Sequence, residues 1–235
     1  MLQEGLTDSL DSIINLMYNS PEQTVSFEDQ PLGIKAKVTF LPGALMSLEF
    51  SQHNKDKNIV FKTPDFPVFA YHNSVARLTP IYNQLKFLEK KPNYANSDLL
   101  LSFSATVSNI SLMLGEQSLI KTENQITDLI PQNLRNEMII VCGPISENIV
   151  LTVHFVRLIR DGVQRNDGTT FWRPFTPDST FTHLGKEYTV VESILMKQKY
   201  KNQALLLSQL RALQMNLSAI SVNLSAEDEE DESSA

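Results

Sequence analysis

The feature that most constrains this chain is an apolar repeat close to its C-terminus. Its members are spaced 4, 3, 4, 3 and 4 residues apart, and they are Leu206, Leu210, Leu213, Leu217, Ile220 and Leu224. This spacing is the a and d repeat of a coiled-coil seam, so the segment is predicted to be a long amphipathic helix. Further apolar positions widen the stripe, namely Leu205, Leu207, Ala212 and Ala219. Such a helix must be covered on more than one side, either by the chain's own sheet or by an oligomer seam shared with another chain.

The chain before this helix is predicted to be rich in strands. Residues 33–40, "GIKAKVTF", alternate apolar and polar side chains, as a strand with one buried face does. Similar patterns predict strands at 44–50, 58–62, 98–114, 137–143, 148–162 and 185–191. A short helix is expected near the N-terminus, with Thr7 as its N-cap. A second short helix is expected over residues 79–91, with Thr79 as the N-cap and Pro80 as the first helical residue.

Strands that follow one another through short turns indicate a mainly β, α+β fold, as an antiparallel sandwich or a Greek-key barrel with a few short helices. We expect a β-rich body over residues 1–190, the amphipathic helix over 191–225 and an acidic tail over 226–235. Six of the 27 acids lie at 227–232, which leaves 21 acids against 20 bases in the rest. The body is therefore nearly neutral, and the block of like charge is expected to stay solvated, dock on a basic partner or mask the protein's own basic strip.

A second unusual segment is "RNDGTTFWRPFTPDSTF", residues 165–181, which contains the only tryptophan of the chain. Its turn signals predict a hairpin followed by a loop. With the arginines of the preceding strand, it supplies a candidate contact set for a protein partner or a nucleic acid: Arg157, Arg160, Arg165, Phe171, Trp172, Arg173 and Phe175. Trp and Arg often dominate binding between proteins, whereas single-stranded nucleic acid stacks on rings in a positive groove. A third alternative is that the rings fill the domain's own core.

Lys197, Lys199 and Lys201 extend this mildly basic region. Together with the acidic C-terminus, this layout resembles phage-type single-strand DNA-binding proteins, which pair a β-barrel with an acidic tail. The resemblance implies nucleic-acid binding that the tail regulates. It covers the layout only, so it assigns no functional residue. The nearly neutral body argues against a strong nucleic-acid binder.

The chain has no sequence motif for phosphate binding, nucleophilic catalysis or zinc-dependent hydrolysis. Cys142 lies in the apolar stretch "MIIVCGP", where a thiol is expected to be buried rather than reactive. His154 is expected on the face opposite Leu151 and Val153, toward solvent or an interface. The four histidines lack ligand spacing, so no metal and no cofactor is predicted.

A single cysteine excludes an internal disulfide and indicates a reducing compartment. No signal peptide and no membrane-spanning run are predicted, so the expected location is the cytoplasm or a virion, without secretion.

We therefore predict a non-catalytic structural or assembly subunit of a multi-protein complex, with a virion or phage component among the candidates. It would form homo- or hetero-oligomers through the aromatic and arginine segment and the leucine-rich helix. The alternative is a single-stranded nucleic-acid-binding protein with a regulatory acidic tail, and an enzyme is a third class.

Overall fold

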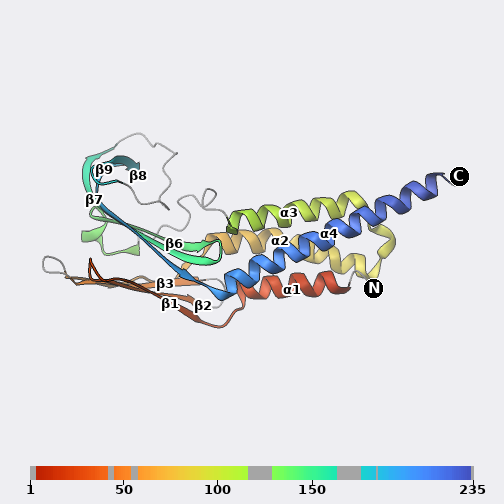
Figure 1. The fold of residues 1–235 in the computed structure, drawn as a ribbon, viewed down its shortest axis with the longest axis horizontal. Coiled ribbons are helices and arrows are strands. Elements are labelled where there is room, and N and C mark those ends of the chain that lie inside the picture. Colours follow the sequence, from red (N-terminus) through yellow and green to blue (C-terminus); the bar gives the residue numbers. More distant parts are fainter. Residues whose placement is uncertain are drawn as a thin grey trace.

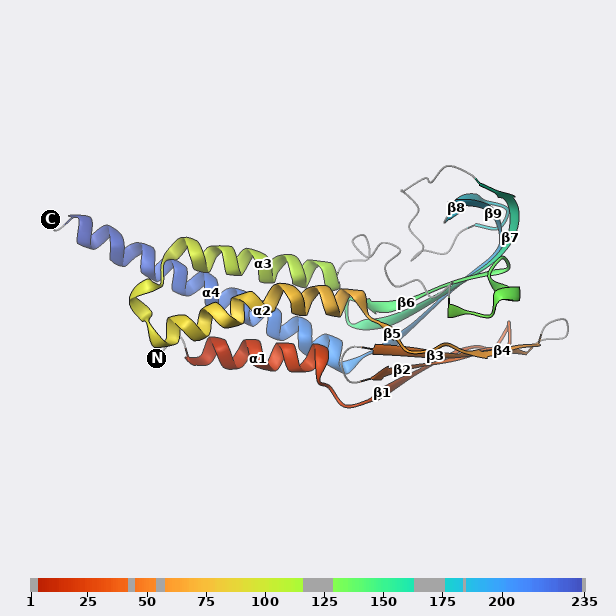
Figure 2. The ribbon, with the colours of Figure 1, turned by 180° about the vertical axis from the view of Figure 1, so that it is seen from behind.

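The computed structural model describes residues 4–41, 45–53, 58–115, 129–162, 176–183 and 185–233. The molecule is elongated, with helices at one end and two antiparallel sheets at the other (Figures 1 and 2). The helices are α1 (Glu4–Tyr18), α2 (Phe69–Lys90), α3 (Ser97–Gly115) and α4 (Lys201–Ser233). The fold is thus α+β, and neither sheet closes into a barrel. The expected α+β class and the long C-terminal helix are confirmed, but the other helices are not all short, since α2 has 22 residues and α3 has 19.

The four helices form an antiparallel bundle. α1 and α3 run toward the sheets, whereas α2 and α4 run away from them (Figure 1). α1 packs on α2, α2 on α3 and α3 on α4, and α4 closes the bundle against α1. Helices from both ends of the chain are therefore needed to complete it. The hydroxyl of Thr7 in α1 donates a hydrogen bond to the carboxylate of Glu89 in α2, so Thr7 joins two helices rather than capping its own.

The first sheet is inserted between α1 and α2. Its strands are β1 (Gln23–Asp29), β2 (Ile34–Leu41), β3 (Leu45–His53), β4 (Asn58–Lys62) and β5 (Phe66–Pro67). They are ordered β1-β2-β3-β4, and β5 pairs with β3. The predicted alternation in β2 is confirmed, since Ala36 and Val38 are buried and Lys35 and Lys37 are exposed. Gly33 has a φ of +64°, and a Cβ there would lie 2.0 Å from the carbonyl oxygen of His53, so the turn before β2 requires glycine.

The second sheet is inserted between α3 and α4. Its strands are β6 (Met138–Ile145), β7 (Asn148–Asp161), β8 (Thr180–His183) and β9 (Lys186–Lys199), in the order β6-β7-β9-β8. One continuous apolar core includes Phe50 of the first sheet, Leu151 of the second and Leu210 of α4. The opposite face of the second sheet buries a smaller core that includes Val141 and Val190. Sheets and bundle are therefore held by shared burial of apolar surface.

Residues 98–114 were predicted to be a strand and are helix α3 instead. The buried residues Leu100, Phe103, Val107, Ile110 and Leu114 follow helical spacing. Residues 99–107 also alternate between apolar and polar side chains, as a strand does. Both patterns fit because residues 100 and 101 are both leucine, so one satisfies the helical spacing and the other satisfies the alternation. The segment is helical because this spacing puts its apolar side chains on one stripe, which packs against α2 and α4.

The predicted start of α2 at Thr79 is also wrong, because the helix begins at Phe69 and contains Pro80 in its interior. Proline removes the hydrogen bond to the carbonyl of Ala76. Ala76 and Pro80 are both exposed, so water can satisfy that carbonyl. Thr79 hydrogen-bonds the carbonyl of Val75 at 2.8 Å instead of capping a helix.

The C-terminal helix begins ten residues later than the expected position 191, because β9 continues to Lys199. It also runs on to Ser233, so the backbone of the acidic residues 227–232 belongs to α4 rather than to a separate tail.

A buried polar cluster joins the bundle to the sheets. Gln203 of α4 is fully buried, and its Oε1 accepts a hydrogen bond of 2.8 Å from the Tyr71 hydroxyl of α2. Its Nε2 donates to the carbonyl of Leu114 at the end of α3, over 3.3 Å. The same carbonyl accepts a bond from the backbone N–H of Ser146, between β6 and β7. One side chain thus ties together three helices at the point where they meet the second sheet.

We predict that Tyr71→Phe lowers the free energy of unfolding by about 1–3 kcal/mol, because it leaves the buried Gln203 oxygen without its donor. Burial raises the pKa of the Tyr71 hydroxyl well above its usual range, so it stays a donor throughout ordinary buffers. Urea unfolding measures the change. The control is Tyr94→Phe, which removes a hydroxyl from an exposed ring and should change stability by less than about 0.5 kcal/mol. Equal losses in the two variants would contradict the cluster's role.

Candidate docking surfaces

The leucine repeat lies inside the chain's own helical bundle. Leu206, Leu210, Leu213, Leu217 and Ile220 are buried, and Leu224 is partly buried against the same core. α4 packs on α3 and α1 rather than mainly on a sheet. The residues that we predicted as an oligomer seam are therefore covered by helices of one chain. A surface for a second macromolecule must be sought on another face of α4.

A line of small polar contacts marks where α3 meets α4. The hydroxyls of Ser104 and Ser218 lie 2.8 Å apart, and those of Ser97 and Ser221 also lie 2.8 Å apart. Ser225 donates to the Ser97 hydroxyl over 2.7 Å. Serines along both helices let the two backbones approach closely. On both helices, the residue that directly follows each of these serines in the sequence is exposed and points out of the bundle.

On α4, the residues just after the contact line form an exposed stripe. Its positions are spaced 3, 4, 3, 4, 3 and 4 residues apart: Leu205, Ser208, Ala212, Met215, Ala219, Val222 and Ala226. We call this set the outer stripe. Met215 is 71% exposed and Val222 is 65% exposed, unusually high values for large apolar side chains on a helix. α4 therefore carries two heptad patterns, one buried in the bundle and one facing outward.

α3 adds to the same side of the molecule. Leu101, Ala105 and Leu112 are exposed. In two antiparallel helices, a step of one residue from the contact line turns both side chains toward the same side of the pair. Leu101 and Leu112 therefore flank the outer stripe. We call the outer stripe and these three residues of α3 the α3–α4 face.

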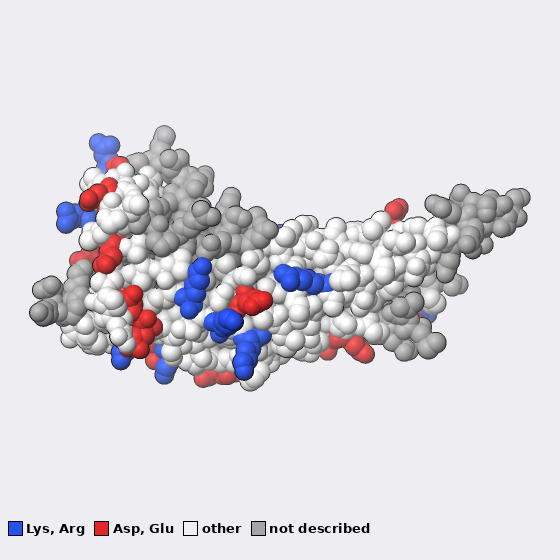
Figure 3. Space-filling view, in the orientation of Figure 1, with Lys and Arg blue, Asp and Glu red and all other residues white. Residues whose placement is uncertain are grey.

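The α3–α4 face is nearly free of charge. Asp98 is the one charged residue of α3, and Arg211 is the one charged residue between positions 202 and 226 of α4. Figure 3 shows the same contrast, because few charged side chains appear over these two helices while many gather over the sheets. By length and composition alone, α3 is also apolar enough to cross a membrane, with a mean hydropathy of 1.3. Only a third of this stretch is buried in the bundle, whereas core helices of similar composition in soluble proteins are mostly buried.

Part of the aromatic and arginine segment lies outside the described residues, namely Arg165, Phe171, Trp172, Arg173 and Phe175. Arg157 and Arg160 are exposed near the end of β7. Phe181 is buried and stacks on Tyr188, with ring centroids 5.7 Å apart, so this ring of the segment belongs to the smaller core.

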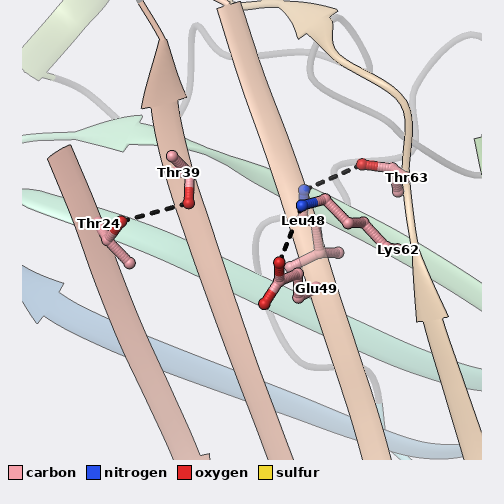
Figure 4. A network of polar contacts seen from close by, with 6 residues as sticks. All are labelled: Thr24, Thr39, Leu48, Glu49, Lys62 and Thr63. Atoms are coloured by element: carbon pink, nitrogen blue, oxygen red, sulfur yellow. Dashed lines mark hydrogen bonds and ion pairs between the residues drawn. The ribbon is translucent and has the colours of Figure 1, made fainter. Parts of the chain in front are cut away.

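The outer face of the first sheet is polar, and two of its lysines pair with carboxylates. Lys62 donates a 2.9 Å hydrogen bond to Glu49, and Thr24 and Thr39 contact each other across β1 and β2 (Figure 4). The bond from Lys62 lowers the pKa of the Glu49 carboxyl, and the pKa of Lys62 rises in return. A groove of about 760 Å³ is lined by these two residues among others. Its other carboxylate, Glu28, lies 3.6 Å from Lys35, so both carboxylates that line the groove are paired with a lysine.

Cys142 and His154 are both fully buried. Burial raises the pKa of the Cys142 thiol well above its usual range, which keeps it protonated and a poor nucleophile. The expectation that His154 faces solvent or an interface is wrong, because the ring is fully buried within the chain and its Nδ1 lies 2.6 Å from the Ser193 hydroxyl. Within the described ranges, no group of three or more His, Cys, Asp or Glu side chains could hold a metal ion.

No protein-family model and no curated protein matches this chain. In the sequence, Leu205, Ala212 and Ala219 stand out as a widening of the leucine stripe. Sequence reasoning did not recognise them as part of a second 3-and-4 repeat, and it missed the contribution of α3. Ala and Ser fill several positions of the outer stripe, and these residues contribute little to an apolar periodicity.

Proposed function

We propose that this protein is a non-catalytic assembly subunit that docks on other macromolecules through the α3–α4 face. The observation that carries the proposal is the exposure of Leu101, Leu112, Met215 and Val222 on a face with almost no charge. Large exposed apolar patches on soluble proteins mark interaction sites. Depletion of charge with enrichment of apolar side chains is typical of the buried centre of an interface.

The arrangement of the rest of the molecule supports this role. The two sheets share a core with the bundle, and we infer that they act as a sandwich-like frame holding the helices. Arg157 and Arg160, which are exposed near the end of β7, would belong to a second docking element at the sheet end of the molecule. A cytoplasmic machine or a virion would use such a two-ended subunit to connect its parts.

The proposal predicts that the protein runs in a large assembly in a native extract. Gel filtration followed by immunodetection should find it well above twice its own 26.5 kDa. Leu101→Glu with Val222→Glu places two charges in the face, and this double variant should move to small fractions while keeping its circular dichroism. Asn83→Glu, at an exposed position of α2, is the matched control and should stay in the assembly. Recovery of the wild-type protein only at one or two times its own mass would contradict the proposal.

Single-stranded nucleic-acid binding is the second candidate. It is favoured by the exposure of Lys197, Lys199 and Lys201 in one row where β9 leads into α4. Basic groups in a row can follow a phosphate backbone, and the binding would weaken with salt.

Under this second candidate, adding oligo-dT at low salt should strongly quench the fluorescence of Trp172, the only tryptophan. Deletion of residues 227–235 should tighten binding several-fold, because six competing acids are removed. Unchanged fluorescence across the titration would remove this candidate and would leave the assembly proposal intact.

A further inference from the structure

We propose that the partner on the α3–α4 face is a second copy of this chain, with the two α4 helices antiparallel along their outer stripes. The inference rests on the proposed function, since it identifies one occupant of the same face. Three observations carry it: the continuation of the outer stripe into charged residues, the opposite sign of those charges at its two ends, and the size of the face.

The spacing of the outer stripe continues beyond its apolar members. Four residues before Leu205 is Lys201, which is exposed at the first position of α4. Three residues after Ala226 is Glu229, whose backbone lies in the last turns of the same helix. The repeat therefore covers about four heptads, the length at which a coiled-coil pattern becomes firm. It begins with a cation and ends with an acid.

The charges at the ends select the direction of pairing. A two-fold axis beside Met215 places Ser208 of one helix opposite Val222 of the other, and it places Leu205 opposite Ser225, one residue from Ala226. The same register brings Lys201 opposite Glu229, and the exposed Lys199 near position 231, which is also acidic. A parallel pairing would instead set Lys201 against Lys201 and the acidic blocks against each other. Attraction at both ends thus favours the antiparallel arrangement.

Small side chains along the stripe suit close packing around a central anchor. Ala212 and Ala219 face each other across the proposed axis on either side of Met215. Interaxial distances fall toward the short end of the usual 8–10 Å range when contact residues are small. The exposed Met215 and Val222 side chains would then fill the gaps that the alanines leave.

The face is large enough for a stable dimer. Residues 201–229 extend for about 42 Å along α4 at 1.5 Å per residue, and α3 lies alongside for about 28 Å. With helices about 10 Å wide, the two together offer roughly 700 Å² per copy, within the range that specific interfaces bury per partner. The C-terminal end of α4 also projects past the other helices (Figures 1 and 2), and in the pair this projection would lie along the other copy's β9–α4 junction.

Cross-linking of the purified full-length protein tests the register directly. Cys142, the only native cysteine, is fully buried, so any disulfide between two copies must form through the introduced thiols. Under mild oxidation, a mixture of Leu205→Cys and Ala226→Cys proteins should give a disulfide-linked heterodimer, and Met215→Cys should give a homodimer. Ala226→Cys alone should give none, whereas a parallel pair would cross-link it. Thr24→Cys, exposed on the first sheet, is the background control.

Analytical ultracentrifugation supplies the second measurement. The wild-type protein should sediment at twice the 26.5 kDa mass of the chain. Lys199→Glu with Lys201→Glu should raise the dimer dissociation constant at least tenfold, and high salt should weaken the wild-type dimer in the same direction.

The outcomes separate this inference from the proposed function. A wild-type monomer at 100 µM, or cross-linking of Ala226→Cys alone, overturns the antiparallel dimer. A monomer that still runs in a large assembly in the extract overturns the dimer and leaves the assembly function standing. A dimer with the predicted cross-links that binds nothing else in the extract supports this inference and overturns the assembly function.

Discussion

The rest of the structure depends on one constraint, the burial of the leucine repeat of α4 within the chain's own helical bundle. Leu210, Leu213 and Leu217 are fully buried, and they hold together helices from both ends of the chain. Each such leucine contributes roughly 1.5–3 kcal/mol by leaving water. Because the leucine repeat is buried inside the bundle, α4 can contact another molecule only through its outward face, which is nearly free of charge.

The junction at Gln203 explains how one helix serves both ends of the molecule. Its amide joins α2 and α3 just where β9 turns into α4, so the position of α4 in the bundle is fixed relative to the second sheet. A docking event on the α3–α4 face would then orient the sheets as well. The exposed arginines of β7 and the lysines of β9 would be carried to a defined place relative to the partner.

Much of the fold was predictable where one periodicity dominates. The alternation in "GIKAKVTF" gave strand β2, and the leucine spacing gave the C-terminal helix. Prediction failed where two periodicities coexist, as in α3, whose consecutive leucines satisfy both a strand and a helix. It failed again at Pro80, because the exposure of Ala76 that makes an internal proline tolerable depends on tertiary packing. The leucine spacing correctly predicted a helix with a buried apolar stripe. The sequence alone cannot tell whether the helices that cover this stripe belong to the same chain or to another.

The exposure of Met215 gives the most direct test of the claim that the α3–α4 face is covered in the working protein. Hydroxyl-radical footprinting compares its oxidation in the assembled protein with that in the diluted, dissociated chain. Met46, which is buried in the core, serves as the internal reference. The account predicts strong protection of Met215 on assembly with no change at Met46. Equal oxidation of Met215 in the two states would contradict it.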